Sequence, residues 1–180
     1  MSRHQSRRRQ RGQIVPITAL AMIALIGGVA LILEGGNAYA HQREAQNASD
    51  AVANAGAAVL AESLGGVAKT DAQVETSMEN VTLANYLNDY DGYYTDVTGH
   101  LLTNGGATTT SLGAAARVGD GLIPPGAQGV QAIGTQTFTT TFGRVIGLPQ
   151  FTATSTLSVE YSCPANRNDA VAAAACPKQP

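Results

Sequence analysis

The sequence predicts an α+β protein in which a long N-terminal helix is followed by a small antiparallel β-containing domain. Residues 14–33 form an unbroken apolar run, and the alanine-rich residues 38–64 continue it with helical spacing. Residues 151–161 alternate between apolar and polar side chains, as a half-buried strand does. The chain has 180 residues, and those left beyond the helix suffice for one small domain.

The N-terminal segment, residues 1–13, carries five arginines and no acid, although the whole chain has a net charge of −2. A basic cluster directly before an apolar span is typical of the cytoplasmic side of a membrane helix. We therefore expect a basic cytoplasmic tail at 1–13 and an extracytoplasmic location for everything after the span. No folded module adjoins the arginines, so we expect no nucleic-acid partner.

Residues 14–33 are long enough to cross a bilayer, because twenty helical residues rise about 30 Å. Pro16 lies in the first turn, where a missing N–H is tolerated. Glu34 is the first charge after the span, and we expect it to reach the membrane surface without a partner. Gly35 and Gly36 follow it and are expected to bend or locally melt the helix.

Two processing sites compete with a permanent anchor. Ala38-Tyr39-Ala40 fits a signal-peptidase site, and cleavage between Ala40 and His41 would release a secreted surface or binding protein. The apolar run is longer than a secretory signal usually has, which favours the anchor. Gly12-Gln13 resembles a prepilin-peptidase site, but Ile17 stands where that pattern has a glutamate.

The stalk, residues 34–66, is predicted to be a helix that packs against its own domain. Small apolar residues recur at steps of three and four, which gives one narrow seam: Ala45, Ala48, Val52, Ala55 and Val59. Polar residues occupy the other side: Arg43, Glu44, Asn47, Asp50, Asn54 and Glu62. Gly65-Gly66 is expected to end the helix.

The order of motifs along this helix resembles the N-terminal pattern of TadE/TadG-like proteins, over about residues 11–60. Gly-Gln precedes the span, an acid and a glycine follow it, and Gln46-Asn47-Ala48-Ser49-Asp50-Ala51 lies in the stalk. The chain departs from that pattern where Glu34 replaces an aspartate and Ala45 replaces a leucine. The residues that stand at the positions of the family motif are Gly12, Gln13, Glu34, Gly36, Tyr39, Gln46, Asn47 and Asp50. Residues 142–147 loosely resemble a recurrent C-terminal segment of TadG-like proteins.

This resemblance implies a structural component of the Tad (tight adherence, Flp) adhesive pilus of bacteria. The implied protein is pseudopilin-like, with a pilin-like layout, and acts by helix and domain packing. It would cross the cytoplasmic membrane once and contact the lipid bilayer and other pilus-assembly or pilin-like subunits through its N-terminal helix.

In the domain, residues 67–162, Thr70-Asp71-Ala72-Gln73 is a capping-box pattern that predicts a helix over about 71–88. We interpret residues 89–96 as an acidic, aromatic turn. Its acids Asp89, Asp91 and Asp96 leave a calcium loop as an alternative, although the terminal glutamate of such a loop is missing. Residues 103–129 are rich in Gly, Thr and Pro and predict a loop with one helical turn at 112–117.

The last third of the chain predicts strands at 130–133, 135–142 and 151–161, with residues 143–150 joining the last two as an antiparallel hairpin. Cys163 and Cys176 lie in the C-terminal tail, residues 163–180. In an extracytoplasmic compartment these two cysteines are expected to form a disulfide.

No catalytic constellation is evident in the sequence. His4, His41 and His100 lie in the basic tail, on the stalk and in an expected loop, and none accompanies a nucleophile or a set of metal ligands. We therefore predict a non-enzymatic protein without cofactor or metal. A membrane-anchored enzyme remains the rival class.

Overall fold

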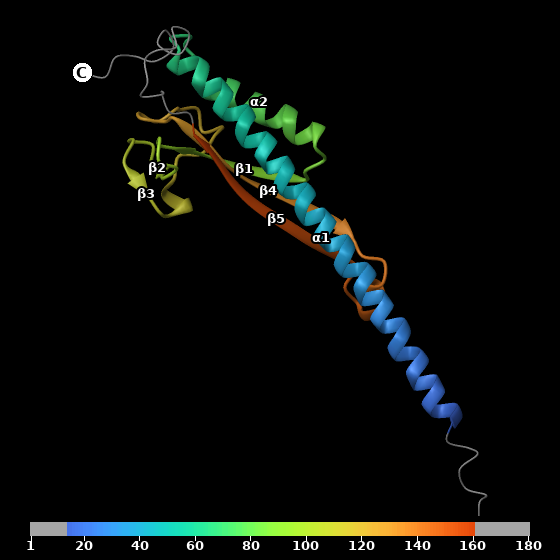
Figure 1. Ribbon diagram of the computed structural model, residues 1–180. Helices are drawn as coiled ribbons and strands as arrows, with labels where there is room; N and C mark the ends of the chain where they lie inside the picture. The colour runs from blue at the N-terminus through green and yellow to red at the C-terminus, as the bar shows by residue number, and fades with distance from the viewer. Residues whose placement is uncertain (1–13, 161–180) are drawn as a thin grey trace, which may run out of the picture.

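The computed structural model describes residues 14–160 and has the predicted α+β architecture. Helix α1 (Ile14–Leu64) is 51 residues long. Its N-terminal half projects away from the rest of the molecule, and its C-terminal half lies across one face of a sheet (Figure 1). Helix α2 (Asp71–Ala84) packs beside the C-terminal half of α1.

The sheet has five antiparallel strands in the order β3-β2-β1-β4-β5. Their bounds are β1 (Asp89–Thr95), β2 (Leu101–Leu102), β3 (Thr108–Thr109), β4 (Gly129–Thr139) and β5 (Gln150–Glu160). Strands β4 and β5 form the predicted hairpin and pair along their whole length. This hairpin runs beside α1, and its connection lies toward the projecting half of the helix (Figure 1).

The predicted stalk seam is confirmed in its first half, and in its second half the buried residues differ from those predicted. Ala45, Ala48 and Val52 are buried, whereas Ala55 and Val59 are only half-buried. The buried stripe continues instead through Ala53, Ala57 and Leu60. A straight helix has 3.6 residues per turn, so its buried face rotates by about 20° per heptad away from a seven-residue repeat.

Small residues let α1 approach the sheet closely. Gly134 on β4 faces the helix, and a Cβ there would collide with the Ser49 hydroxyl and lie 3.1 Å from Leu87 Cδ1. Ser155 Oγ on β5 donates to the Ala45 carbonyl at 2.9 Å and lies 2.6 Å from Ser49 Oγ. The buried hydroxyls are thus satisfied within the contact itself.

Both helix boundaries between α1 and α2 confirm the predicted caps. Gly66 has φ +92°, its N–H donates to the Ser63 carbonyl at 3.1 Å, and the Val67 N–H donates to the Glu62 carbonyl at 3.1 Å. This is a Schellman ending. At the start of α2, the Thr70 N–H donates to the Gln73 side chain at 3.0 Å.

Helix α2 ends at Ala84, four residues before the predicted end at 88. Tyr86 has φ +57°, a left-handed conformation that no helix continues through. The Leu87 N–H then donates back to the Thr82 carbonyl at 3.3 Å.

The predicted bend at Gly35-Gly36 is wrong, because α1 is a continuous helix through both glycines. Glycine costs a helix interior only about 1 kcal/mol relative to alanine. Contacts on either side outweigh this cost, since Glu34 and Ala38 both touch the β4–β5 hairpin.

The predicted turn at 89–96 is also wrong: residues 89–95 form strand β1, in the middle of the sheet. Tyr94 is fully buried there, and Asp91 forms an ion pair with Arg117. Asp89 and Asp91 therefore belong to a paired strand, whereas Asp96 lies in the turn that follows it. Within residues 14–160, no group of three His, Cys, Asp or Glu side chains is placed to hold a metal ion.

The remaining strand predictions are nearly right. Residues 129–139 form the single strand β4, where two strands at 130–133 and 135–142 were expected. In β5, Ala153 and Ser155 are buried while Thr152, Thr154 and Thr156 are exposed, which confirms the predicted alternation over these five residues, although Phe151 before them is exposed. In the predicted loop at 103–129, the helical turn expected at 112–117 is the shorter 3-10 helix η1 (Leu112–Ala114), and the strand β3 was not expected.

Candidate functional site

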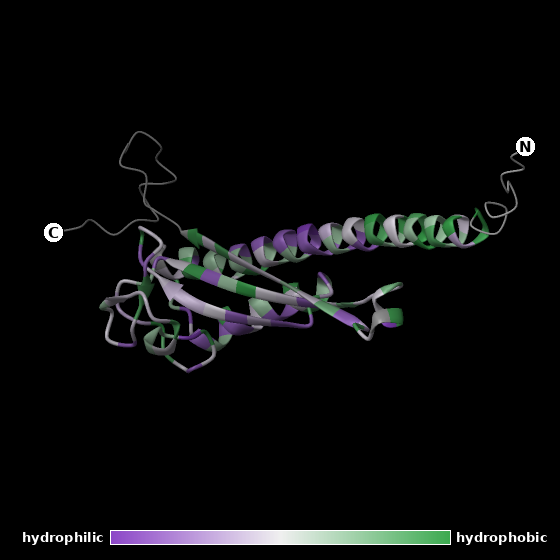
Figure 2. Cartoon of the chain, turned by 90° about the horizontal axis from the view of Figure 1, so that it is seen from below, coloured by the Kyte–Doolittle hydropathy of each residue, from purple (hydrophilic) through white to green (hydrophobic). Residues whose placement is uncertain are grey.

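The projecting half of α1 is an exposed apolar rod. Its large hydrophobic side chains between Ile14 and Leu33 are each 56–75% exposed, and none contacts the domain core. In the described part of the chain, α1 is the one helix long and apolar enough to cross a membrane. Figure 2 shows this end as a continuous hydrophobic stretch that gives way to polar residues near the middle of the helix.

Glu34, directly after this rod, is bound to the domain, contrary to our expectation that it has no partner. Its carboxylate accepts hydrogen bonds from the backbone N–H groups of Thr141 and Phe142, at 3.2 Å and 3.0 Å. These donors lie 107 and 108 positions away, in the β4–β5 connection. The connection is therefore attached to α1 at the residue where its apolar run ends.

A second set of contacts attaches the next turn of α1 to the same hairpin. The ring of His41 stacks on Phe138, with centroids 4.3 Å apart, and its Nδ1 lies 3.0 Å from the Glu44 carboxylate. Ala38 packs against the small cluster of Ala45, Phe138 and Ala153. Residues on both sides of the candidate Ala40–His41 cleavage site therefore hold one hairpin in place.

The polar motif of the stalk faces away from the domain. Tyr39, Gln46, Asn47 and Asp50 are exposed, and none of these four side chains makes a hydrogen bond to the domain within residues 14–160. The guanidinium carbon of Arg43 lies 5.9 Å from the centre of the Tyr39 ring, so these two side chains also share the outer surface. Gly36 is exposed as well, with open space where a side chain would be.

The motif residues Gly12 and Gln13 lie outside the described residues. The same is true of the predicted disulfide between Cys163 and Cys176.

Asp71, at the start of α2, is the one acidic or basic residue that is buried among residues 14–159. Its carboxylate accepts hydrogen bonds from the Tyr94 hydroxyl at 2.5 Å, the Gly119 N–H at 3.0 Å and the Gly121 N–H at 2.6 Å. Burial, together with this hydrogen bond to Asp71, raises the pKa of the Tyr94 hydroxyl. Asp71 thus connects the loop at 119–121 and strand β1 to the start of α2, and its role is to stabilise the fold.

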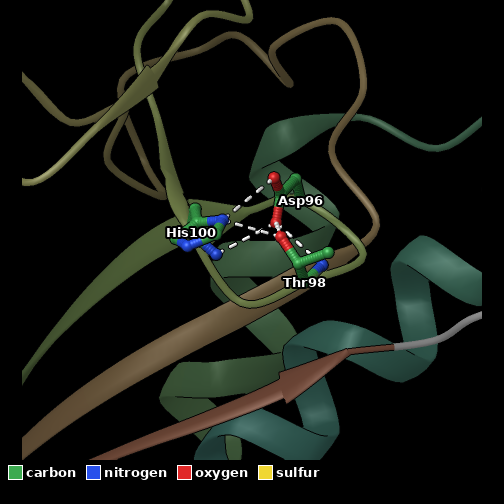
Figure 3. Close-up of polar contacts among 3 residues, drawn as sticks. All are labelled: Asp96, Thr98 and His100. Atoms are coloured by element: carbon green, nitrogen blue, oxygen red, sulfur yellow. Dashed lines mark hydrogen bonds and ion pairs between the residues drawn. The ribbon is translucent and has the colours of Figure 1, made fainter.

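Asp96, Thr98 and His100 form a second polar cluster, in the turn between β1 and β2 (Figure 3). Asp96 Oδ1 accepts from the backbone N–H groups of Thr98 and His100 at 2.8 Å and 3.0 Å. The hydrogen bond from the Thr98 side chain, above all, lowers the pKa of Asp96. These bonds close an exposed turn, and only His100 also borders a shallow hollow along β3.

Fold and surface together define a class of protein: one long helix, apolar and exposed at its start, packed at its end on a small antiparallel sheet. Residues 12–59 match the family model Tad, described as "Putative Flp pilus-assembly TadE/G-like". The predicted resemblance over about residues 11–60 is thereby confirmed, and the description names assembly, a structural role. Comparisons with curated proteins and with solved structures found no match.

Proposed function

We propose that this protein is a membrane-anchored assembly component of a bacterial Tad-type adhesive pilus. In this proposal residues 14–33 span the cytoplasmic membrane, residues 1–13 lie in the cytoplasm, and the α+β domain lies outside it. The observation that carries it is where the family match falls. The matched residues 12–59 comprise the exposed rod and the polar stalk motif, and they include no strand of the sheet.

The stalk is divided between two tasks. Its buried face, with Ala45, Ser49 and Val52, is occupied by the chain's own sheet. Its outer face, with Gln46, Asn47 and Asp50, is exposed to solvent. We infer that this outer face contacts another pilus-assembly or pilin-like subunit, and that the protein works by helix and domain packing.

Small residues in the span fit the same mode of action. Gly27 and Gly28 have open space around them, with nothing within 4 Å of a Cβ placed at either position. Such positions allow the backbone of a second membrane helix to approach closely. The same helix can therefore serve as anchor and as a packing surface for a neighbouring span.

The anchored form is favoured over release after Ala40 by the contacts of the domain. Cleavage there would remove Glu34, whose carboxylate binds Thr141 and Phe142, and Ala38, which packs near Phe138. Processing at Gly12-Gln13 would leave all these contacts in place. We therefore infer that the mature chain keeps residues 14–40.

Two measurements test the proposal in a bacterium that encodes this chain. We expect the protein to stay in the membrane fraction after alkaline carbonate extraction, as a spanning helix does. We also expect in-frame deletion of its gene to abolish surface pili, and the wild-type gene to restore them. Normal piliation in the deletion strain, or a mature N-terminus at His41, would contradict the proposal.

A further inference from the structure

The connection between β4 and β5 exposes an unusual amount of apolar surface. Val145 is 84% exposed and Leu148 is 47% exposed, and Phe142 and Phe151 beside them are also exposed. Arg144 adds a cation in the middle of this group. In Figure 2 the end of this connection stands out as a hydrophobic tip that points toward the same side as the span.

This exposure is not the result of a loosely built loop. The Thr140 hydroxyl donates to the Leu148 carbonyl at 2.5 Å, and the Leu148 N–H donates to the Gly143 carbonyl at 2.8 Å. A short 3-10 helix, η2 (Gly143–Ile146), lies inside this closed loop. A Cβ at Gly143 would lie only 2.5 Å from the Leu148 carbonyl oxygen. The backbone is thus fixed while the apolar side chains of Val145 and Leu148 remain exposed.

The position of the connection along α1 is fixed as well. Glu34 accepts hydrogen bonds from Thr141 and Phe142, and Leu33 immediately before it is the last residue of the apolar run. The exposed tip therefore lies at the level where the span would leave the hydrocarbon core. Side chains at that level meet lipid headgroups and the upper acyl chains.

We propose that residues 142–148 form a membrane-contacting tip that inserts into the lipid interface beside the span. This inference rests on the membrane anchoring proposed above. Val145 and Leu148 enter the boundary between headgroups and acyl chains, and Arg144 binds lipid phosphate. A helix alone can rotate and tilt in a bilayer. A second contact on the same subunit fixes the rotation of α1 and hence the direction of its outer face.

The chain contains no tryptophan, so a single introduced tryptophan reports its own surroundings. We would reconstitute three full-length variants, each in vesicles of phosphatidylcholine and phosphatidylglycerol with or without bromine on the acyl chains. Val145→Trp probes the tip. Leu25→Trp lies in the middle of the span, and Val97→Trp is an exposed position in the β1–β2 turn, at the opposite end of the sheet.

The proposal predicts that brominated lipid quenches the emission of the Val145→Trp and Leu25→Trp variants and leaves that of the Val97→Trp variant unchanged. Quenching in the Leu25→Trp variant without quenching in the Val145→Trp variant would overturn the tip and leave the anchor intact. A blue-shifted but unquenched emission from the Val145→Trp variant would also overturn the tip, in favour of a protein neighbour. Absence of quenching in the Leu25→Trp variant would overturn both proposals. Equal far-ultraviolet circular dichroism of the three variants establishes that each has folded.

Discussion

The carboxylate of Glu34 accepts a hydrogen bond from the backbone N–H of Phe142, at 3.0 Å and across 108 positions of sequence. One residue thereby marks the end of the apolar run and the attachment of the β4–β5 hairpin. Because Ala38 and His41 contact the same hairpin, the sheet is held against α1 from the first turn beyond the apolar run. The domain is thus attached directly at the end of the apolar half of α1 rather than at the end of a free stalk.

Glu34→Gln tests this coupling. The amide has one neutral acceptor oxygen in place of the two oxygens of the carboxylate, and hydrogen bonds to a charged group contribute more than neutral ones. We expect a loss of about 1 kcal/mol of stability. Amide hydrogen exchange at Thr141 and Phe142 should become faster.

Asp50→Asn is the matched control, because it replaces an exposed acid of the same helix that makes no side-chain bond to the domain. It should leave exchange at Thr141 and Phe142 as it is in the wild type. Equal exchange in the Glu34→Gln variant and the wild type would contradict the coupling.

Gly134→Ala tests the close approach of helix and sheet. The new Cβ would collide with the Ser49 hydroxyl, and overpacking of this kind costs about 1–3 kcal/mol. Ser49→Ala removes the colliding oxygen. The double variant should therefore lose less stability than the sum of the losses in the two single variants. Thermal unfolding of the full-length chain in detergent measures the coupling. Strict additivity would show that the helix does not lie against Gly134.

Asp71→Ala tests the polar lock at the start of α2. The substitution leaves the buried Tyr94 hydroxyl without its acceptor, and we expect a loss of about 3 kcal/mol. Hydrogen exchange at Gly119 and Gly121 should also become faster. Asp120→Ala changes the neighbouring exposed acid and should leave both the stability and the exchange near wild type.

Alkaline pH should destabilise the domain through the half-buried Tyr90 and the buried Tyr94. Burial, followed by the nearby carboxylates, raises the pKa of Tyr90 from its ordinary value to about 12. The folded state therefore holds a proton that the unfolded state has lost, so stability falls as the pH rises from about 10 to about 12. Tyr94 acts in the same direction.

Tyr90→Phe should make this fall of the melting temperature less steep. Tyr86→Phe is the control, because that side chain is 84% exposed. A Tyr90→Phe variant with the wild-type slope would contradict the assignment to Tyr90.

The features that follow from local pattern could be predicted from the sequence. Apolar length indicated the rod of α1, strict alternation indicated β5, and the caps at Gly66 and Thr70 marked helix ends. The wrong predictions concern residues whose structure depends on a contact with a residue far away in the sequence. The acidic residues of β1 suggested a turn, but in the folded chain Asp91 lies in a strand and forms an ion pair with Arg117. Glu34 accepts its hydrogen bonds from residues that only folding brings near it.

The candidate site shows the same division. The motif residues and the polar face of the stalk were recognisable from the sequence, but the attachment of Glu34 to the β4–β5 hairpin requires the three-dimensional packing. The seam prediction included Ala55, whereas the sheet selects Ala53 and Ala57 because a straight helix does not keep a seven-residue repeat.

The central claim is that the outer face of the stalk contacts another pilus-assembly subunit while the inner face holds the domain. A photo-crosslinking amino acid at Asn47, introduced in cells that assemble the pilus, tests this most directly. Asn80, an exposed asparagine on α2, is the matched control position. We predict a crosslink from position 47 to a protein that mass spectrometry identifies as a pilus component, and no such product from position 80. Equal products from both positions, or none from position 47 in piliated cells, would contradict the claim.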